Sequence, residues 1–251
     1  MVLHRVIFIA VICLLNAPSS LQLTKPVPLT DIKCSKKRQL RPGDCARAYQ
    51  KIIYDTDLTL DQSEITLEKV SGSCVTRIDN PKFLNVPKEI IEDAFNQVVT
   101  KCDGVPGHAN LTSFDGVRVL VRHHTRPSVY GYEDDTELNQ SICFRDSDTQ
   151  DIVEEDCMEA YRLLPTDTAG HFLSVEHHVQ GNSIGLTFKT CLVSVWTSDG
   201  SKIIVLKGDM ERLFGKLMQQ CKVNGKGGTL ITEGAQGKNG KVNLQVSTPK
   251  T

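Results

Sequence analysis

The chain has 251 residues, of which 39% are hydrophobic and 24% are charged, and this balance argues against wholesale disorder. Its formal net charge is −1. There is no basic excess that would neutralise a phosphate backbone, so we expect no nucleic-acid partner.

The N-terminus has the features of a secretory signal peptide. His4 and Arg5 precede an apolar run over residues 6–15, and Ala17-Pro18-Ser19 supplies the small residues that a signal peptidase recognises. An apolar run of about ten residues is too short to cross ~30 Å of hydrocarbon, which disfavours a membrane anchor. We therefore predict a signal peptide over residues 1–19 and a secreted, extracellular protein without a membrane span.

The cysteines indicate a disulfide framework. One of the nine, Cys13, falls in the signal peptide. The other eight are Cys34, Cys45, Cys74, Cys102, Cys143, Cys157, Cys191 and Cys221. An even number in a secreted chain implies disulfide bonds, although eight cysteines can pair in roughly 100 ways.

A six-residue motif occurs twice and indicates an internal repeat. Residues 44–49 and 156–161 share the pattern Asp-Cys-x-x-Ala-Tyr. Each copy is followed by a cysteine in an apolar run, an amphipathic stretch that ends in cysteine, a glycine-rich segment and an alternating strand. Aligning Cys221 with Cys102 brings the two apolar stripes into register, with Met210, Leu213, Phe214, Leu217 and Met218 on Ile91, Ala94, Phe95, Val98 and Val99.

The elements of the first copy follow in chain order. Residues 20–33 are expected to form an extended lead-in. A helix over residues 44–54 has Asp44 as its predicted N-cap, and strands are predicted over residues 63–70 and 74–78. A second helix runs from Pro87 to Cys102. The loop Gly104-Val105-Pro106-Gly107 and a strand through residues 117–121 complete the copy.

The second copy repeats this order. A helix over residues 157–164 is predicted to be capped by Asp156 and stopped by Pro165. Strands are predicted over residues 172–179 and 186–196, the latter containing Trp196 as a core or inter-unit residue. The helix that ends at Cys221, a glycine loop over residues 225–228 and a strand through residues 242–246 follow.

The order strand, helix, strand, strand, helix, strand suits an antiparallel sheet with both helices on one face. We therefore predict an α+β fold of two tandem, disulfide-bridged α/β sandwich units in β-α-β-β-α-β order. The units span residues 34–124 and 143–248, and a linker spans residues 125–142.

The helix directions lead to a prediction of the disulfide pairing. If the two helices of a unit run antiparallel, the first begins near the point where the second ends. This predicts the bonds Cys45–Cys102 and Cys157–Cys221. By elimination, it also predicts Cys34–Cys74 and Cys143–Cys191.

No group of residues has the pattern of a catalytic, cofactor-binding or metal site. The pairs His123-His124 and His177-His178 would point to opposite faces of a strand, so neither pair can chelate one ion. The cysteines are better explained by disulfides than by zinc. Residues 225–229 lack the spacing of a phosphate loop. We therefore expect a protein that is not an enzyme, and a secreted enzyme stays an alternative that a deep pocket with converging polar groups would favour.

Two sequons, Asn110-Leu111-Thr112 and Asn139-Gln140-Ser141, predict N-glycosylation at Asn110 and Asn139. Both lie in segments predicted to be loops, where the acceptor amide would be accessible.

The cysteine pattern resembles that of a group of fungal proteins. Asp-Cys-x-x-Ala is followed by Ser73-Cys74-Val75 or Thr190-Cys191-Leu192-Val193, then by a helix that ends in cysteine and a glycine-rich loop. This arrangement resembles small secreted cysteine-rich proteins of fungi, some of them candidate effectors of plant infection, and in architecture the virally encoded killer toxins of smut fungi. It covers both units and carries no catalytic signature.

The resemblance implies a secreted, non-enzymatic fungal protein that needs no cofactor. Its expected role is that of a virulence effector that binds an unknown host or competitor protein through its surface loops. The alternatives are a killer-toxin-like protein or an extracellular hydrolase inhibitor, and growth inhibition of target cells would distinguish the toxin.

Overall fold

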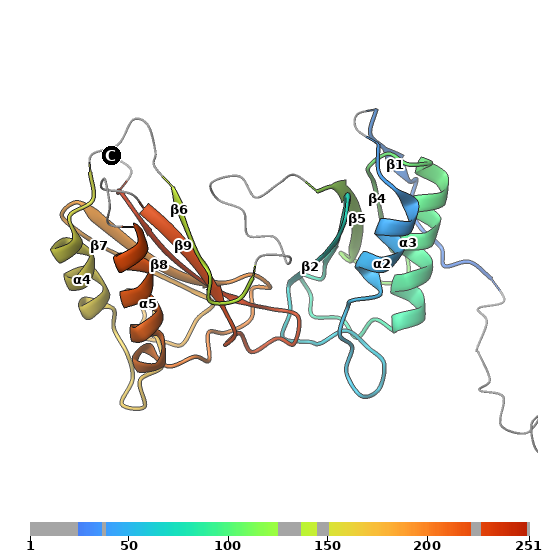
Figure 1. The fold of residues 1–251 in the computed structure, drawn as a ribbon. Coiled ribbons are helices and arrows are strands. Elements are labelled where there is room, and N and C mark those ends of the chain that lie inside the picture. Colours follow the sequence, from blue (N-terminus) through green and yellow to red (C-terminus); the bar gives the residue numbers. More distant parts are fainter. Residues whose placement is uncertain (1–24, 37–38, 125–136, 145–150, 222–226, 250–251) are drawn as a thin grey trace, which may run out of the picture.

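The computed structural model describes residues 25–36, 39–124, 137–144, 151–221 and 227–249. These residues form two units, each a five-stranded antiparallel sheet with two helices on one face (Figure 1). The predicted α+β class with two tandem disulfide-bridged units is therefore confirmed. The predicted signal peptide and residues 125–136 of the predicted linker lie outside the described residues. None of the described helices has the length and hydropathy needed to cross a bilayer.

The two units contain the same seven elements in the same order. The first consists of β1 (Lys33–Cys34), α2 (Pro42–Tyr49), β2 (Thr66–Ser71), β3 (Cys74–Asp79), α3 (Lys88–Cys102), β4 (Gly107–Asn110) and β5 (Arg118–His123). The second consists of β6 (Ser141–Phe144), α4 (Glu154–Leu163), β7 (Ser183–Phe188), β8 (Cys191–Thr197), α5 (Lys207–Cys221), β9 (Gly227–Thr232) and β10 (Val242–Ser247).

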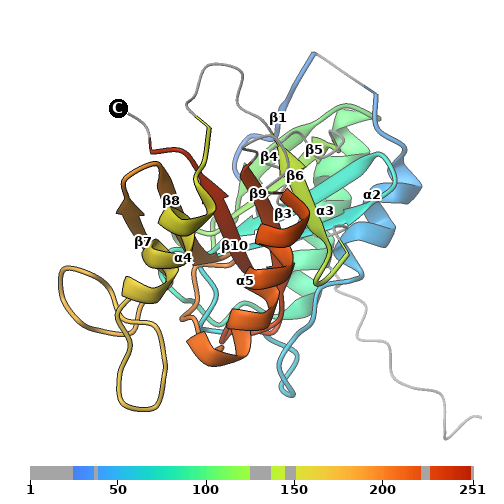
Figure 2. The same cartoon turned by 60° about the vertical axis from the view of Figure 1, so that its left-hand side comes forward.

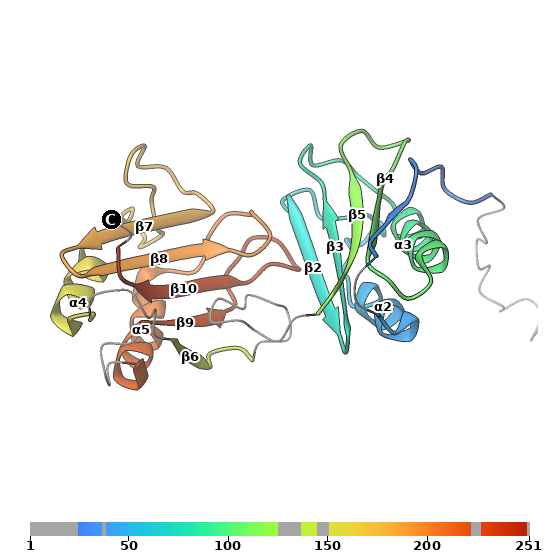
Figure 3. The same ribbon diagram turned by 90° about the horizontal axis from the view of Figure 1, so that it is seen from above.

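The strand orders also correspond, being β1-β4-β5-β3-β2 in the first unit and β6-β9-β10-β8-β7 in the second. Figure 2 shows α4 and α5 in front of the second sheet, and Figure 3 shows α2 and α3 together on one side of the first. Each unit has a separate apolar core between its helices and its sheet, centred on Phe95 in the first and on Phe214 in the second. This correspondence supports the duplication inferred from the motif.

Each unit contains one strand more than the predicted order, because the glycine segments form strands rather than loops. Gly107 begins β4, and Gly227 and Gly228 begin β9. A Cβ atom on Gly107 would overlap the Cys102 sulfur, and one on Gly228 would lie 2.7 Å from the Cys221 sulfur. The glycines therefore leave room for a disulfide against the sheet, a use of glycine in strands that composition alone does not reveal.

Two of the predicted strands in the second unit are wrong. Residues 172–179 form bridges and turns instead of a strand, and the first hairpin strand is β7, which begins at Ser183. The single strand predicted over residues 186–196 is two strands joined at a turn where Lys189 has φ 46°. The turn is only Lys189 and Thr190, between strands rich in β-branched and aromatic residues, so it is too short to interrupt the hydrophobic pattern.

The prediction that Asp44 and Asp156 cap their helices is also wrong. The helices begin earlier, at Pro42 and Glu154, and neither has a side-chain cap. The Asp44 carboxylate accepts hydrogen bonds from the Ser73 N–H and Oγ, both at 2.8 Å. Asp156 likewise accepts from Thr190 Oγ1 at 2.7 Å and from its N–H at 3.3 Å. Each aspartate therefore ties the first helix to the turn of the neighbouring hairpin.

The remaining motif residues also make internal contacts. Ala48 and Ala160 are completely buried. The Tyr49 ring stacks on Phe95 with centroids 5.4 Å apart, and the Tyr161 ring stacks on Phe214 at 4.2 Å. Stacked aromatic pairs stabilise a core beyond their buried area. The residues that recur in the motif are therefore part of the scaffold.

The structure corrects the predicted disulfide pairing. The bonds are Cys34–Cys102, Cys45–Cys74, Cys143–Cys221 and Cys157–Cys191. All four lie within a unit, as the repeat implied. The pairing differs because α2 packs over β2 and β3 whereas α3 packs over β1, β4 and β5. Each helix is therefore cross-linked to a strand beneath it and not to the other helix.

We expect Asp44→Ala to lower the free energy of unfolding by about 1–2 kcal/mol, because two donors of Ser73 lose their buried acceptor. The hydrogen bond from the Ser73 N–H is the main reason that the pKa of Asp44 lies below its ordinary value. The stabilisation is therefore present above that ordinary value and is lost as the pH falls through the lowered one. Urea denaturation at pH 7 and pH 3 would measure the loss. Arg47→Ala removes only the exposed ion-pair partner and should cost less than about 1 kcal/mol.

Candidate binding sites

The two units meet through loops of the first unit and turns of the second. The N–H groups of Ile65 and Thr66 donate to the Asp199 carbonyl at 2.8 and 3.1 Å. The Asn239 side chain accepts from the Ile53 N–H and donates to the Ile53 carbonyl, both at 2.8 Å. We call this contact the junction, and its backbone bonds fix the angle between the two sheets.

Two buried carboxylates lie at the junction. Glu64 accepts from the Asn239 N–H at 2.5 Å and from its Nδ2 at 2.9 Å. Asp199 Oδ1 accepts from the Ser201 N–H and Oγ, whereas its buried Oδ2 has no hydrogen-bond partner. Both carboxylates approach Gly237, where a Cβ atom would overlap Asp199 Oδ2 and lie 2.7 Å from Glu64 Oε1. Only glycine fits between them.

The pKa of Glu64 is raised to about 7. Burial is the main cause, the hydrogen bonds from Asn239 oppose the rise, and the nearby charges of Asp199 and Asp61 contribute to it. A shift of this size in a buried carboxyl can mark a functional site or a structural contact. Since the side chain is only 3% exposed and its oxygens face Asn239, its role is structural.

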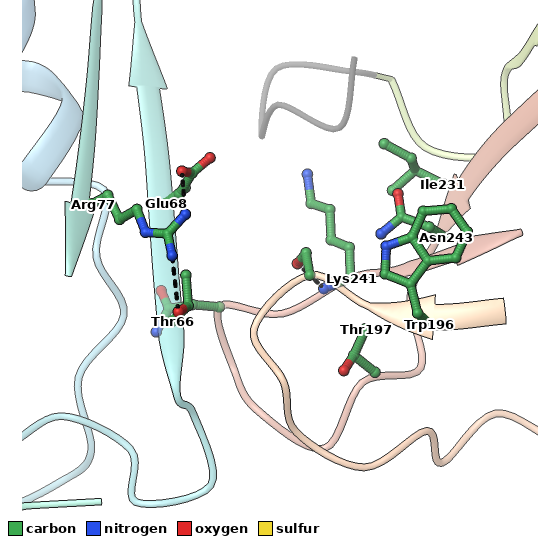
Figure 4. A pocket seen from close by; sticks show the side chains of 10 residues that line it. Thr66, Glu68, Arg77, Trp196, Thr197, Ile231, Lys241 and Asn243 are labelled. Atoms are coloured by element: carbon green, nitrogen blue, oxygen red, sulfur yellow. Dashed lines mark hydrogen bonds and ion pairs between the residues drawn. The ribbon is translucent and has the colours of Figure 1, made fainter. Parts of the chain in front are cut away.

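A cavity of about 240 Å³ lies beside the junction, between the two sheets (Figure 4). The first unit lines it with Thr66, Glu68 and Arg77, and the second with Trp196, Thr197, Ser198, Ile231, Asn239, Lys241 and Asn243. The charged residues of the first unit in this lining are engaged in ion pairs. Arg77 pairs with Glu68 at 3.5 Å and with Asp79, just outside the lining, at 2.6 Å. Trp196 thus lies between the units, one of its two predicted locations. The buried amide of Asn243 has no hydrogen-bond partner.

A larger groove, of about 780 Å³, runs between α4 and α5 on the helical side of the second unit. Its lining combines Tyr161 and Phe214 with the exposed side chain of Met158. The rim is acidic and includes Glu154, Glu155, Glu159 and Glu211. We call it the helix groove.

The charges around the helix groove differ from those at the same place in the first unit. When Cys157 is aligned with Cys45, the positions of Glu154, Glu155 and Glu159 are occupied by Pro42, Gly43 and Arg47. Met158 corresponds to Ala46. The scaffold residues around these positions are the same in both units, so the fold does not require the acidic rim. Glu154 and Glu155 also lie in the first turn of α4, where negative charge stabilises a helix, whereas Glu159 lies beyond that turn.

The basic rim residues are already engaged. Arg162 pairs with Glu159 at 2.6 Å, and Lys207 Nζ donates to the Arg162 and Leu164 carbonyls at 2.7 and 2.8 Å. Glu155 and Glu211 are exposed, and no described residue forms an ion pair with either. The groove therefore presents negative charge around an apolar floor.

The remaining predicted sites lie apart from these features. Asn110 ends β4 and Asn139 lies in a turn, and both are exposed, so their glycosylation stays a prediction. His123 and His124 lie at the end of the first sheet, and His177 and His178 lie in a loop of the second unit. Within the described ranges no three histidine, cysteine or acidic side chains gather as metal ligands would.

The sequence analysis missed the residues of the junction and the acidic rim. Glu64, Asp199 and Asn239 lie far apart in the chain, and nothing local marks them as partners. The acidic rim did leave a signal, because Glu154 and Glu155 stand where the first copy has Pro42 and Gly43. A residue-by-residue comparison of the two copies would have found it.

The solved structures to which this chain is similar include two plant ectodomains. No protein-family model matches the chain, and no curated protein matches it. One structure is the tandem DUF26 ectodomain of the Arabidopsis thaliana cysteine-rich receptor-like protein PDLP8, with 10% identity, a TM-score of 0.30, and coverage of 88% of this chain and 98% of that one. The other is the tandem DUF26 ectodomain of PDLP5 from the same plant, with 11% identity, a TM-score of 0.28, and coverage of 89% and 100%.

Proposed function

We propose that this chain is a secreted, non-enzymatic protein that binds a partner protein through the helix groove of its second unit. The observation that carries the proposal is the groove itself, about 780 Å³ between α4 and α5, with an apolar floor and an acidic rim in which Glu154, Glu155 and Glu159 have no acidic counterpart in the first unit. Grooves between two helices commonly receive the apolar face of a partner helix.

The chemistry of the groove specifies the partner segment. Met158 is 47% exposed beside the Tyr161 and Phe214 rings, so the floor can receive apolar side chains. A flexible thioether adapts to side chains of different shapes. Glu155 and Glu211 on opposite helices would face lysine or arginine on the rim of the segment. The partner segment is therefore an amphipathic helix with a basic polar face.

The four disulfides support an extracellular role. Disulfide bonds persist in oxidising compartments such as the outside of the cell. Here each one joins a helix to a strand and stabilises a small core. Together with the resemblance to secreted fungal proteins, they support the narrower proposal of a fungal effector acting on a host protein. Deleting the gene in the source organism tests that role, and unchanged infection would count against it without affecting the binding proposal.

The binding proposal is tested with two synthetic amphipathic helical peptides of equal length, one carrying lysines on its polar face and the other glutamates. We expect the lysine peptide to bind about tenfold more tightly than the glutamate peptide by fluorescence anisotropy, and its affinity to fall as salt rises. The double variant Glu155→Lys, Glu211→Lys should reverse the preference. Met158→Asp should weaken both peptides, because it places a charge on the apolar floor.

The control is Glu89→Lys, which makes one such Glu-to-Lys change, half the charge change of the double variant, at an exposed site on α3 of the first unit. This variant should bind the lysine peptide as the unaltered protein does. Equal binding of the two peptides, or equal losses in the control and the double variant, would show that the groove does not select basic segments.

A further inference from the structure

A second polar cavity lies on the outer face of the first sheet, the face opposite its helices. It measures about 380 Å³ and is lined by Thr30, Asp31, Lys33, His108, Asn110 and Arg118. Three of these residues are basic and come from three strands that are neighbours in the sheet order, β1, β4 and β5, beginning at its β1 edge. We call them the basic cluster.

The strand registers place the basic cluster on one face. Lys33 on β1 is paired with His108 on β4. His108 is paired with Leu120, two residues from Arg118 on β5, so Arg118 is its diagonal neighbour. Paired and diagonal neighbours on one face of a sheet are within reach of long side chains. A small ligand can therefore touch all three.

The charges of the cluster are not compensated within the described chain. No described residue forms an ion pair with Lys33 or Arg118, and the buried Nε of Arg118 has no hydrogen-bond partner. Asp31 is the one acidic residue in the lining. Burial lowers the pKa of His108, and the charges of Arg118 and Lys33 lower it further. A cationic pocket with an unsatisfied guanidinium donor is suited to bind an anion.

The second unit shows that the fold does not require this cluster. Cys34 and Cys143 pair with Gly107 and Gly228 in their sheets, and these glycines pair with Val121 and Val246. By their positions relative to these paired residues, Lys33 corresponds to Ile142, His108 to Thr229 and Arg118 to Asn243. None of them is charged, yet the same sheet forms. The basic residues of the first unit therefore have a role other than stabilising the strands.

We propose that the basic cluster binds a tetrahedral oxyanion, either free phosphate or the phosphate of a small phosphomonoester. Arg118 donates through its guanidinium, whose planar donors match phosphate oxygens, and Lys33 contributes a point charge. His108 donates from a ring nitrogen, and the Thr30 hydroxyl lies in the same lining to complete the shell. This site is on a different unit from the helix groove and does not depend on it.

The test is a titration of the full mature chain with inorganic phosphate, with glycerol phosphate as the second ligand. Because Asn110 is in a sequon, the protein comes from a host that adds no N-glycans. Nuclear magnetic resonance records the chemical shifts of the histidine rings during the titration. The His108 signal is the one that disappears in the variant His108→Gln. Potassium chloride at matched ionic strength is the reference. We expect phosphate to saturate the site and raise the pKa of His108, because a bound anion stabilises the protonated ring.

Variants distinguish a site from general attraction to positive charge. Arg118→Gln and Lys33→Gln should each weaken phosphate binding by about tenfold, and the pKa of His108 should rise in both variants without ligand. The control is Arg122→Gln on the same strand, where Arg122 already pairs with Glu68 at 3.2 Å. It should leave binding unchanged. A response equal to that of chloride, or equal losses in the control and Arg118→Gln, would overturn the proposal. Binding of glycerol phosphate but not of phosphate would assign the site to the ester.

Discussion

Raising the pH from 4 to 8 is expected to remove about 3 kcal/mol of stability through Glu64 alone. Its pKa is about 7 in the folded protein against an ordinary value of 4.5, and each unit of difference corresponds to about 1.4 kcal/mol. Because the folded pKa is raised, the folded state binds the proton more tightly than the unfolded chain does. The contribution is therefore complete below the ordinary value and is lost as the pH rises through about 7.

The charged groups around Glu64 explain why stability falls as the pH rises and why the loss is expected at the junction. The neighbouring carboxylates of Asp199 and Asp61 disfavour a negative charge on Glu64. Lys238 opposes them only in part, because it already pairs with Asp55. A proton on Glu64 relieves the repulsion at the contact between the units. The junction should therefore open more often in mildly alkaline solution than in mildly acidic solution.

Glu64→Gln tests this prediction, because glutamine keeps an acceptor for the Asn239 N–H but cannot ionise. Urea denaturation across pH 5–8 should show that the free energy of unfolding falls more steeply with pH in the unaltered protein than in the variant. The difference between the two slopes is the contribution of Glu64. Hydrogen exchange at the Ile65 and Thr66 amides should quicken with pH, beyond the chemical rate, only when Glu64 is present. Parallel pH profiles for the two proteins would be the contrary result.

The second large effect is expected when the bridge between α2 and β3 is removed. The double variant Cys45→Ala, Cys74→Ala should lose about 3–4 kcal/mol, since the bond closes a loop with a sequence separation of 29. The corresponding change at Cys34 and Cys102, with a separation of 68, should cost about 1 kcal/mol more in the chain-entropy model. Each unit of this size depends on its bridges, because its core is small.

The single tryptophan allows the two units to be followed separately. Trp196 lies on β8 of the second unit, and the sequence contains no other tryptophan. In the variant that lacks Cys45 and Cys74, circular dichroism should report an early loss of structure. Because Trp196 faces the first unit across the cavity, its fluorescence should change slightly at that step and mainly at the original midpoint. Removing Cys157 and Cys191 is the matched control and should move the fluorescence midpoint itself. A shared shift in both probes would mean that the units unfold as one.

The sequence predicted the architecture because the repeated motif consists of core contacts. The motif residues bond or pack against the hairpin or the second helix, as Asp44, Cys45 and Tyr49 show. The same contacts, and therefore the same fold, are expected where the motif recurs in the second copy. The pairing of the cysteines could not be obtained in the same way. It depends on which half of the sheet each helix covers, a lateral position that helix direction and periodicity do not encode.

The candidate sites were less predictable for two physical reasons. The junction joins single polar residues from distant turns, such as Glu64 and Asn239, and polar residues in turns are usually solvated. The basic cluster requires the register of β1 and β4, and β4 was interpreted as a loop because it begins at Gly107. Of these sites, only the acidic rim could have been identified from the sequence. A comparison of the two copies shows Glu155 and Glu159 where the first copy has Gly43 and Arg47.

The orientation of the two sheets has a consequence for assembly. The helices of the two units point away from each other, with α2 and α3 at one end of the molecule and α4 and α5 at the other (Figure 1). A partner seated between α4 and α5 leaves the helices of the opposite end uncovered. Under the proposed function, a partner in the helix groove would therefore bury one end of the molecule only and leave the helical surface of the first unit open to solvent.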